Sequence, residues 1–419
     1  MTSRQTDALD TRPAARADEV GATYRDVFQS REFRYLFSAT MMSLIGDQLA
    51  KIALSILVFQ RTSSTLLTAL SFGISYAPWI LGGPILSTLA DRLPRRQVMI
   101  FCDCGRVVLV ALLAVPGIPI PALLLVLLAA SMFTPPFESA RSALTTQMLT
   151  GDRYVVGNGL SLTGLQIGNV VGLLAGGALV ALISARGALL IDAGTFAISA
   201  LLIVAGVIER RPAANAPRGS AWHEISAGGR LVFGDARLRA IVLIVWLGSG
   251  CTFAWEGIAA PWAHALGGGA RTVGLLLGVS AVGAGIGSVV IGRLCPPRLR
   301  RKLILPLAVA APGLLGIFLI GNHLAVAIPV LLLSGFGAAF AIPLNAIFMQ
   351  ALPLELRGRA FGVAQGGLQV SQGLGVLVAG ALAGTVHIGL TIGALGLVGA
   401  AASLCVGLLQ PIRPLAQPA

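Results

Sequence analysis

Apolar runs long enough to cross a membrane alternate with short polar segments along most of the chain. A helix needs about 20 consecutive, mainly apolar residues to cross the hydrocarbon core of a bilayer. We therefore expect an all-α membrane protein in which each run forms one spanning helix. The twelve predicted spans are residues 33–59, 66–90, 97–116, 120–140, 158–183, 187–208, 239–264, 272–294, 302–320, 324–350, 359–384 and 388–409.

Residues 209–238 form the longest polar stretch inside the chain and lie midway along it. Apolar side chains recur there at roughly helical spacing, so we expect part of the stretch to lie on the inner membrane surface. It divides the predicted spans into an N-terminal set, residues 33–208, and a C-terminal set, residues 239–409. The polar residues 1–32 and 410–419 would be terminal tails.

The composition also indicates a lipid environment. Of 419 residues, 56% are hydrophobic and 11% are charged, whereas a soluble domain has about 25% charged residues. The net charge of +13 would by itself suit a nucleic-acid partner. Of the 30 Lys and Arg residues, however, all lie in the tails, in alternate loops or at the helix ends beside them, except Arg61, Arg186, Arg271 and Lys51. This asymmetry predicts that both termini and the linker are cytoplasmic, and no nucleic-acid partner is expected.

The two sets of spans repeat one another. A shift of 203 residues lays Gly164-Leu165-Gln166-Ile167 on Gly367-Leu368-Gln369-Val370. Similarly, a shift of 205 residues places Glu256 on Lys51. Two six-helix halves that both begin on the inner side are parallel repeats, related by an axis along the membrane normal.

The loop after the second span carries a recognisable motif, Asp91-Arg92-Leu93-Pro94-Arg95-Arg96. It resembles the signature loop of the major facilitator superfamily, with Ser87 and Pro94 where glycines are usual. The Pro form is similar to the branch that contains macrolide efflux proteins and the enterobactin exporter. The resemblance implies twelve helices in two pseudo-symmetric six-helix bundles, transport by alternating access, and a monomer in the bacterial plasma (inner) membrane.

The fifth span carries a second motif, the glycines Gly159, Gly168, Gly172, Gly176 and Gly177. Their spacing resembles the antiporter motif of the same superfamily, with Leu173 in place of its proline. Small residues at every fourth position form a smooth stripe on a helix. We expect either simple tight packing or a surface on which the two halves slide.

Several polar residues of the spans are candidates for a central cavity. Asp47 lies near mid-depth, where a charge costs roughly 2.5–3.5 kcal/mol, so it needs a wet cavity or a partner. Lys51 follows one helical turn later, and the two would form either a structural ion pair or a proton and substrate site. Glu256 would face Lys51 across the cavity, with Trp255 available for stacking. Gln166 and Gln369 complete this predicted site.

A second group of charges is expected near the inner ends of the spans. Asp103 and Arg106 lie three residues apart, and Glu138 and Arg141 follow in the next span. Together with the loop residues they would form an inner gate rather than merely extend to the interface. The resemblance points to pairing with the eleventh span. The gate residues would be Asp91, Arg92, Arg95, Arg96, Asp103, Arg106, Glu138, Arg141, Arg357 and Arg359. Asp192 is expected to be structural, at the outer end of the sixth span.

No nucleotide-binding Gly-Lys-Ser/Thr loop, His-Glu-x-x-His or nucleophile elbow occurs in the sequence, so an ion gradient would supply the energy. The five cysteines show no metal spacing, and we expect no cofactor, no metal and no enzymatic activity. The expected function is proton-coupled efflux of small apolar or amphipathic compounds such as drugs, antibiotics or siderophore-like molecules. An importer of the same fold and a non-transporting membrane sensor are the alternatives.

Overall fold

The computed structural model describes residues 22–81, 93–210, 221–353 and 356–409. Asp91, Arg92 and most of both tails therefore lie outside the described residues. Within the described part the chain is helical and contains no strand. Among the described residues, eight helical segments are long and apolar enough to cross a membrane, and one of them, Asp152–Gly206, contains two of the predicted spans.

The N-terminal half begins with a short surface helix, α1, capped by the Thr23 side chain. Its further helices follow the predicted order of spans, the second being described as far as Leu81. Non-helical backbone at Ser184 (φ 79°, ψ 162°) separates the fifth and sixth spans inside α9. The elements are α1 (Tyr24–Gln29), α2 (Arg31–Thr62), α3 (Thr65–Gly73), η1 (Ile74–Tyr76), α4 (Ala77–Leu81), α6 (Arg95–Leu113), α7 (Ile120–Ser131), α8 (Thr134–Met148) and α9 (Asp152–Gly206).

The C-terminal half starts with a linker helix and continues with helices at each of the six predicted places. A short 3₁₀ segment interrupts the seventh and the tenth span, whereas a π segment ends the eighth and a 3₁₀ segment ends the ninth. The elements are α10 (Ala221–Gly234), α11 (Ala236–Thr252), η2 (Ala254–Ile258), α12 (Ala259–Ala265), α13 (Ala270–Val289), η3 (Val290–Leu294), α14 (Pro297–Gly313), η4 (Leu314–Leu319), α15 (Leu324–Gly337), η5 (Ala338–Phe340), α16 (Ala341–Ala351), α17 (Arg357–Leu382) and α18 (Ile388–Leu409).

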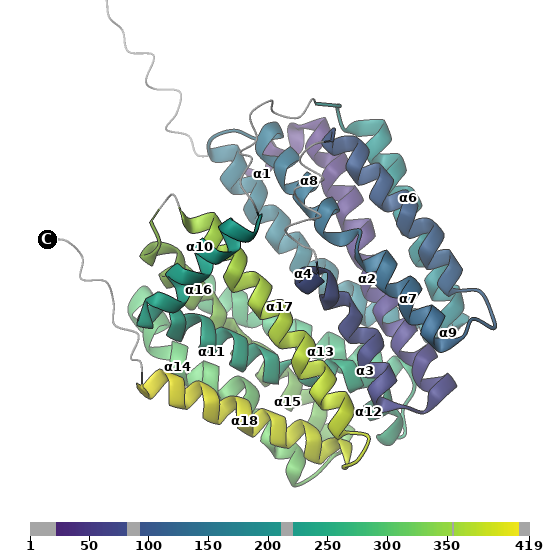
Figure 1. Ribbon diagram of the computed structural model, residues 1–419, viewed down its shortest axis with the longest axis vertical. Coiled ribbons are helices and arrows are strands. Elements are labelled where there is room, and N and C mark those ends of the chain that lie inside the picture. Colours follow the sequence, from purple (N-terminus) through teal and green to yellow (C-terminus); the bar gives the residue numbers. More distant parts are fainter. Residues whose placement is uncertain (1–21, 82–92, 211–220, 354–355, 410–419) are drawn as a thin grey trace, which may run out of the picture.

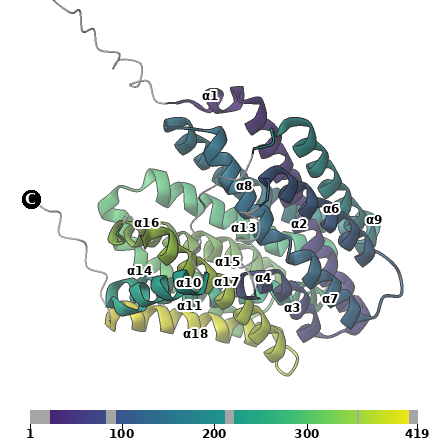
Figure 2. The same ribbon diagram turned by 45° about the horizontal axis from the view of Figure 1, so that its top comes forward.

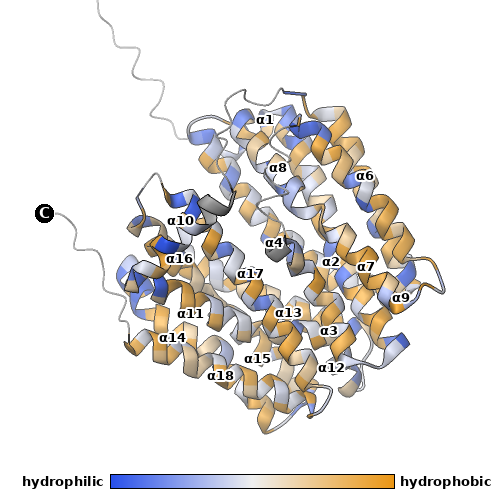
Figure 3. Ribbon diagram, in the orientation of Figure 1, coloured by the Kyte–Doolittle hydropathy of each residue, from blue (hydrophilic) through white to orange (hydrophobic). Residues whose placement is uncertain are grey.

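The helices form two bundles that lie side by side (Figures 1 and 2). Their outward surface is largely apolar, and polar positions gather near the helix ends (Figure 3). Large apolar side chains such as Leu125 and Leu201 are 66% exposed. An apolar surface of this extent is unsuited to water and suits hydrocarbon.

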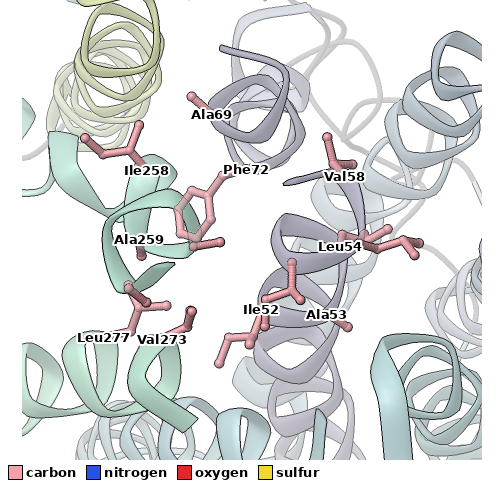
Figure 4. Close-up of a cluster of buried hydrophobic side chains, with 14 of the residues drawn as sticks. Ile52, Ala53, Leu54, Val58, Ala69, Phe72, Ile258, Ala259, Val273 and Leu277 are labelled. Carbon is pink, nitrogen blue, oxygen red and sulfur yellow. The ribbon is translucent and has the colours of Figure 1, made fainter. Parts of the chain in front are cut away.

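The bundles share one hydrophobic core at the end where α2 turns into α3. There Ile52 and Phe72 of the N-terminal half pack with Ile258 and Leu277 of the C-terminal half (Figure 4). Near the linker end, two separate cores each lie within a single bundle, one around Phe137 and one around Phe340–Phe348. The two halves are therefore closed against each other at the end that the charge pattern predicts to be external.

The most extensive contacts between the halves are made by two helix pairs, α9 with α13 and α17 with α3. Thr65 Oγ1 donates a hydrogen bond to the Gly380 carbonyl, at 3.0 Å, across the second pair. Gly380 is the repeat equivalent of Gly177, which approaches Gly274 in the first pair. The internal repeat of the sequence thus appears as two equivalent contacts between the bundles.

The linker helix α10 lies against α11 and α17. Val232 is fully buried, the Phe233 ring meets the Trp246 ring edge-on at 6.0 Å, and a Cβ at Gly228 would overlap the backbone of Arg359. The apolar face of this linker helix packs on the C-terminal bundle. Its expected place on the inner membrane surface stays a prediction.

Candidate functional site

A cavity of about 340 Å³ lies between the two bundles. Its wall carries one cation from the N-terminal half and one carboxylate from the C-terminal half, together with four amide side chains and several apolar ones. The lining residues are Gln48, Lys51, Phe72, Gln166, Asn169, Leu173, Phe253, Glu256, Leu277, Ser280, Ala281, Ala284 and Gln372. We call this space the central cavity.

Glu256 reaches the central cavity because the seventh span is not a continuous α-helix. Helix α11 ends at Thr252, and the 3₁₀ segment η2 places Glu256 on the cavity wall. The preceding residue, Trp255, turns into the protein core: it is 2% exposed and packs edge-on against Trp262, with ring centroids 5.5 Å apart. The expectation that Trp255 stacks on a ligand in the cavity is therefore corrected; the ring is part of the core.

A second cavity, of about 420 Å³, lies within the N-terminal bundle. Its charged lining residues are Asp47, Lys51, Arg106, Glu138 and Asp192. Gln369 reaches it from α17, so the two predicted glutamines border different cavities. Gln48 and Lys51 line both spaces. We call this space the N-terminal cavity; Lys51 stands between it and Glu256.

Asp47 and Lys51 do not form the ion pair that their spacing suggested. Among the ion pairs of the described residues, all within 4.0 Å, none joins these two side chains. The charged groups that act on Asp47 include Arg106, Lys51, Glu138 and Asp192. Asp47 therefore belongs to a larger charged cluster in the N-terminal cavity.

Five of the predicted inner-gate residues that the structure describes, Arg96, Asp103, Arg106, Glu138 and Arg141, fall into separate groups. Arg106 is buried beneath the rings of Phe137 and Phe196, at 5.3 and 5.1 Å, and donates to Thr134 Oγ1 at 3.0 Å. Asp103 instead accepts a hydrogen bond of 2.7 Å from Ser199 Oγ on α9. Arg106 and Glu138 thus belong to the cavity of Asp47, and Asp103 joins α6 to α9.

The remaining charges of the gate make separate local contacts. Glu138 and Arg141 form an ion pair of 2.6 Å. Arg96 donates to the Val204 carbonyl at 2.8 Å and lies 3.6 Å from Glu209. Arg95 is the first residue of α6 and is half-buried.

The two gate arginines of α17 lie near its start. Arg357 donates to the Leu352 carbonyl at 3.2 Å, and Arg359 lies where α10 approaches. Pairing of Asp91 with these arginines falls outside the described residues.

The glycine stripe of α9 packs inside its own bundle. A Cβ at Gly164 would meet the Phe37 ring at 2.8 Å, and one at Gly172 would meet Gln48 Cβ at 2.9 Å. Gly168 and Gly176 likewise face α2, through Leu44 and Ile52. The stripe therefore gives tight packing of two helices in one half, which corrects the expectation that the halves slide on it.

Two glycines of the motif behave differently from that stripe. Gly177 lies on a neighbouring face of α9 and contacts the backbone of Gly274 on α13, in the other half. At Gly159, by contrast, an added Cβ would meet no described atom within 4 Å. Only the Gly177 position therefore bears on how the two halves approach each other.

Sequence reasoning missed two features of the site. Gln48 Nε2 donates to Asn169 Oδ1 at 2.5 Å, which ties α2 to α9 at the border of both cavities. Asp192, expected to be structural, lines the N-terminal cavity beside Asp47. The available signal was that Asp192, like Asp47, is a lone acid within an apolar run.

A sequence model described as Major Facilitator Superfamily matches residues 36–353 and 257–419. The lysophospholipid transporter LplT of Pectobacterium carotovorum is 28% identical over 71% of this chain and 72% of that protein. The enterobactin exporter EntS of Salmonella typhimurium is 24% identical over 79% of this chain and 80% of that protein.

Solved structures with the same arrangement of helices include two inward-facing transporters. A bacterial homologue of the human lysosomal transporter Spinster, inward-facing and occupied, has a TM-score of 0.69 at 16% identity, covering 91% of this chain and 95% of that one. A bacterial homologue of the iron transporter ferroportin, inward-facing, also scores 0.69, at 14% identity, covering 93% and 98%. At such identities the likeness concerns the fold alone.

Proposed function

The chain belongs to the major facilitator superfamily, and from that premise we propose that it exports small amphipathic compounds in exchange for protons. Family and fold support secondary transport across a membrane. The observation that carries the proposal is the central cavity, which has Lys51 of one bundle and Glu256 of the other on its wall. A site shared by two bundles can face either side when they rock against each other.

The distribution of hydrophobic cores supports alternating access. The halves share a core at one end and have separate cores at the other, so the interface at the shared end must open for substrate to leave there. Discrete packed arrangements of this kind give two conformations rather than a continuum. The contacts of Gly177 with Gly274 and of Gly380 with Ala69 belong to the interface between the halves that would open and close.

The substrate class is inferred from the wall of the central cavity. Phe72, Phe253 and Leu277 offer apolar contact, whereas Gln166 and Gln372 offer hydrogen bonds beside the two charges. Sites with apolar walls and a few convergent polar groups suit compounds with both kinds of surface. One similar protein is named as a lysophospholipid transporter and another as an enterobactin exporter, and each supplies a first test compound.

Coupling to protons rests on Asp47 and its position beside Lys51. Both line the N-terminal cavity, and Lys51 also borders the central cavity. A proton on Asp47 removes the charge that competes with Glu256 for Lys51. Binding of a proton in the N-terminal cavity thereby changes the charge balance of the central cavity, so proton binding and substrate binding affect each other.

The experiment is transport in proteoliposomes with an imposed pH difference, using a lysophospholipid, enterobactin and a lipophilic cation. We expect at least one compound to be concentrated on the acidic side only while the gradient lasts. The double variant Asp47→Asn, Lys51→Gln should retain downhill exchange but lose accumulation. Lys51 is replaced as well because Asp47→Asn by itself would leave it as a buried cation without the neighbouring acid. Accumulation on the alkaline side would indicate import, and no transport of a broad panel would favour a sensor.

A further inference from the structure

We propose that Asp192 is a second proton-carrying residue, which shares the coupling proton with Asp47. The inference rests on the proposed function and extends it from one acid to a pair. Asp192 is 1% exposed and lines the N-terminal cavity with Asp47. Its Oδ1 accepts a hydrogen bond of 3.3 Å from Thr195 Oγ1, whereas Oδ2 is buried and has no hydrogen-bond partner in the described part of the chain.

The packing of α9 on α2 brings the two acids together. A Cβ at Gly46 would overlap Asp192 Oδ1 and Thr195 Oγ1. Asp192 therefore rests against the α2 backbone at the residue that directly precedes Asp47. Only glycine leaves room there for a carboxylate from the neighbouring helix, so Gly46 positions the pair.

The other titratable or charged groups around the pair come from four elements: Lys51 on α2, Tyr76 on η1, Asp103 and Arg106 on α6, and Glu138 on α8. Glu138 has its own partner, Arg141, at 2.6 Å. This leaves the carboxylates of Asp47, Asp103 and Asp192 with the cations Lys51 and Arg106. If all were ionised, at least one buried negative charge would lack a partner, because Glu256 also borders Lys51; this is strongly unfavourable. A bound proton reduces the imbalance.

Asp103 is the weaker candidate for holding that proton. It is not among the residues that line the N-terminal cavity, and its hydrogen bond of 2.7 Å from the Ser199 hydroxyl holds it against α9 instead. Asp192 and Asp47 both border the cavity, so water can deliver a proton to either. Two interacting carboxyls of this kind titrate as one unit. The transfer makes and breaks one O–H bond at a carboxylate oxygen, and the proton comes from and returns to water.

Transport assays on Asp192→Asn test the inference. We expect this variant to retain downhill exchange and to lose at least tenfold of the gradient-driven accumulation. Gly194→Ala is the matched control, because it lies two residues from Asp192 on α9, its added Cβ meets no described atom within 4 Å and both carboxyls are kept; it should still accumulate substrate. Accumulation by Asp192→Asn equal to wild type overturns the inference. Failure of the wild type itself to respond to a pH gradient would instead overturn the proposed function.

A second measurement covers the case in which Asp192→Asn does not fold. Infrared difference spectra between acidic and neutral pH record the carbonyl band of a protonated carboxyl. Asp192→Glu keeps a titratable group, and we expect it to shift that band and the pH midpoint of exchange. An unchanged band in Asp192→Glu, with loss of the band in Asp47→Asn, would assign the proton to Asp47 alone and overturn the shared site.

Discussion

Gly177 of α9 and Gly274 of α13 lie backbone against backbone, one from each half of the protein. A Cβ at Gly177 would stand 2.8 Å from both Gly274 N and the Ala270 carbonyl oxygen. Main-chain atoms of packed helices cannot move aside as a flexible side chain can. This contact, with its repeat equivalent between Gly380 and Ala69, sets how closely the halves approach at their shared core.

Gly177→Ala should therefore weaken the closed arrangement at that end. Overpacking of this kind costs about 1–3 kcal/mol, which changes a two-state population by roughly five- to 150-fold. We expect slower transport and faster labelling from outside of a cysteine placed at Ser280, on the wall of the central cavity. Gly194→Ala is the control, since an added Cβ there meets no described atom within 4 Å. Equal labelling in both variants would contradict the prediction.

Lys51 and Glu256 should interact energetically across the central cavity, because both line it from opposite halves. Lys51→Gln and Glu256→Gln each leave the other charge without its counterpart. In a double-mutant cycle on substrate affinity we expect an interaction energy within the usual range of about 0.5–3 kcal/mol. Additive losses in the double variant would show that the two charges act independently.

The hydrogen bond between Trp262 and Asn322 should stabilise the C-terminal half. Trp262 is fully buried, and its Nε1 donates to Asn322 Oδ1 at 2.7 Å. Asn322→Ala leaves this donor without its acceptor, at a cost of about 1–3 kcal/mol. The apparent melting temperature in detergent should fall, whereas His323→Ala, next to it on the chain, should leave it nearly unchanged.

Asp91 lies outside the described residues, so its role stays a prediction from sequence and family resemblance. It is expected to stabilise the outward-open state by pairing near the start of α17, where Arg357 and Arg359 are candidates. Asp91→Asn should slow turnover in proteoliposomes while the amount of protein in the membrane stays the same. Unchanged turnover would leave Asp91 as a determinant of topology only.

The predicted topology also awaits a direct test. The asymmetry of Lys and Arg predicts that both termini and the linker face the cytoplasm. In a cysteine-free background, a membrane-impermeant reagent added outside should label a cysteine at Arg186 and not one at Arg218. Labelling at Arg218 but not at Arg186 would reverse the assigned orientation.

The sequence by itself determined the membrane class, the places of the helices and the division into repeating halves. The reason is that a bilayer demands about 20 apolar residues per crossing, which is a local requirement. It also indicated Asp47, Lys51 and Glu256, because a lone charge in an apolar run is unfavourable without a cavity or partner. The shift of 205 residues that relates Lys51 to Glu256 required only the chain itself.

Only the tertiary structure decided which helix covers which face. In a soluble protein the polar face of a helix points outward, but here lipid and protein interior are equally apolar. The stripe at Gly164–Gly176 therefore did not reveal that its partner is α2 rather than the other half. For the same reason the sequence could not show that the 3₁₀ turn of η2 directs Glu256 to the cavity and Trp255 into the core, or that α9 brings Asp192 beside Asp47.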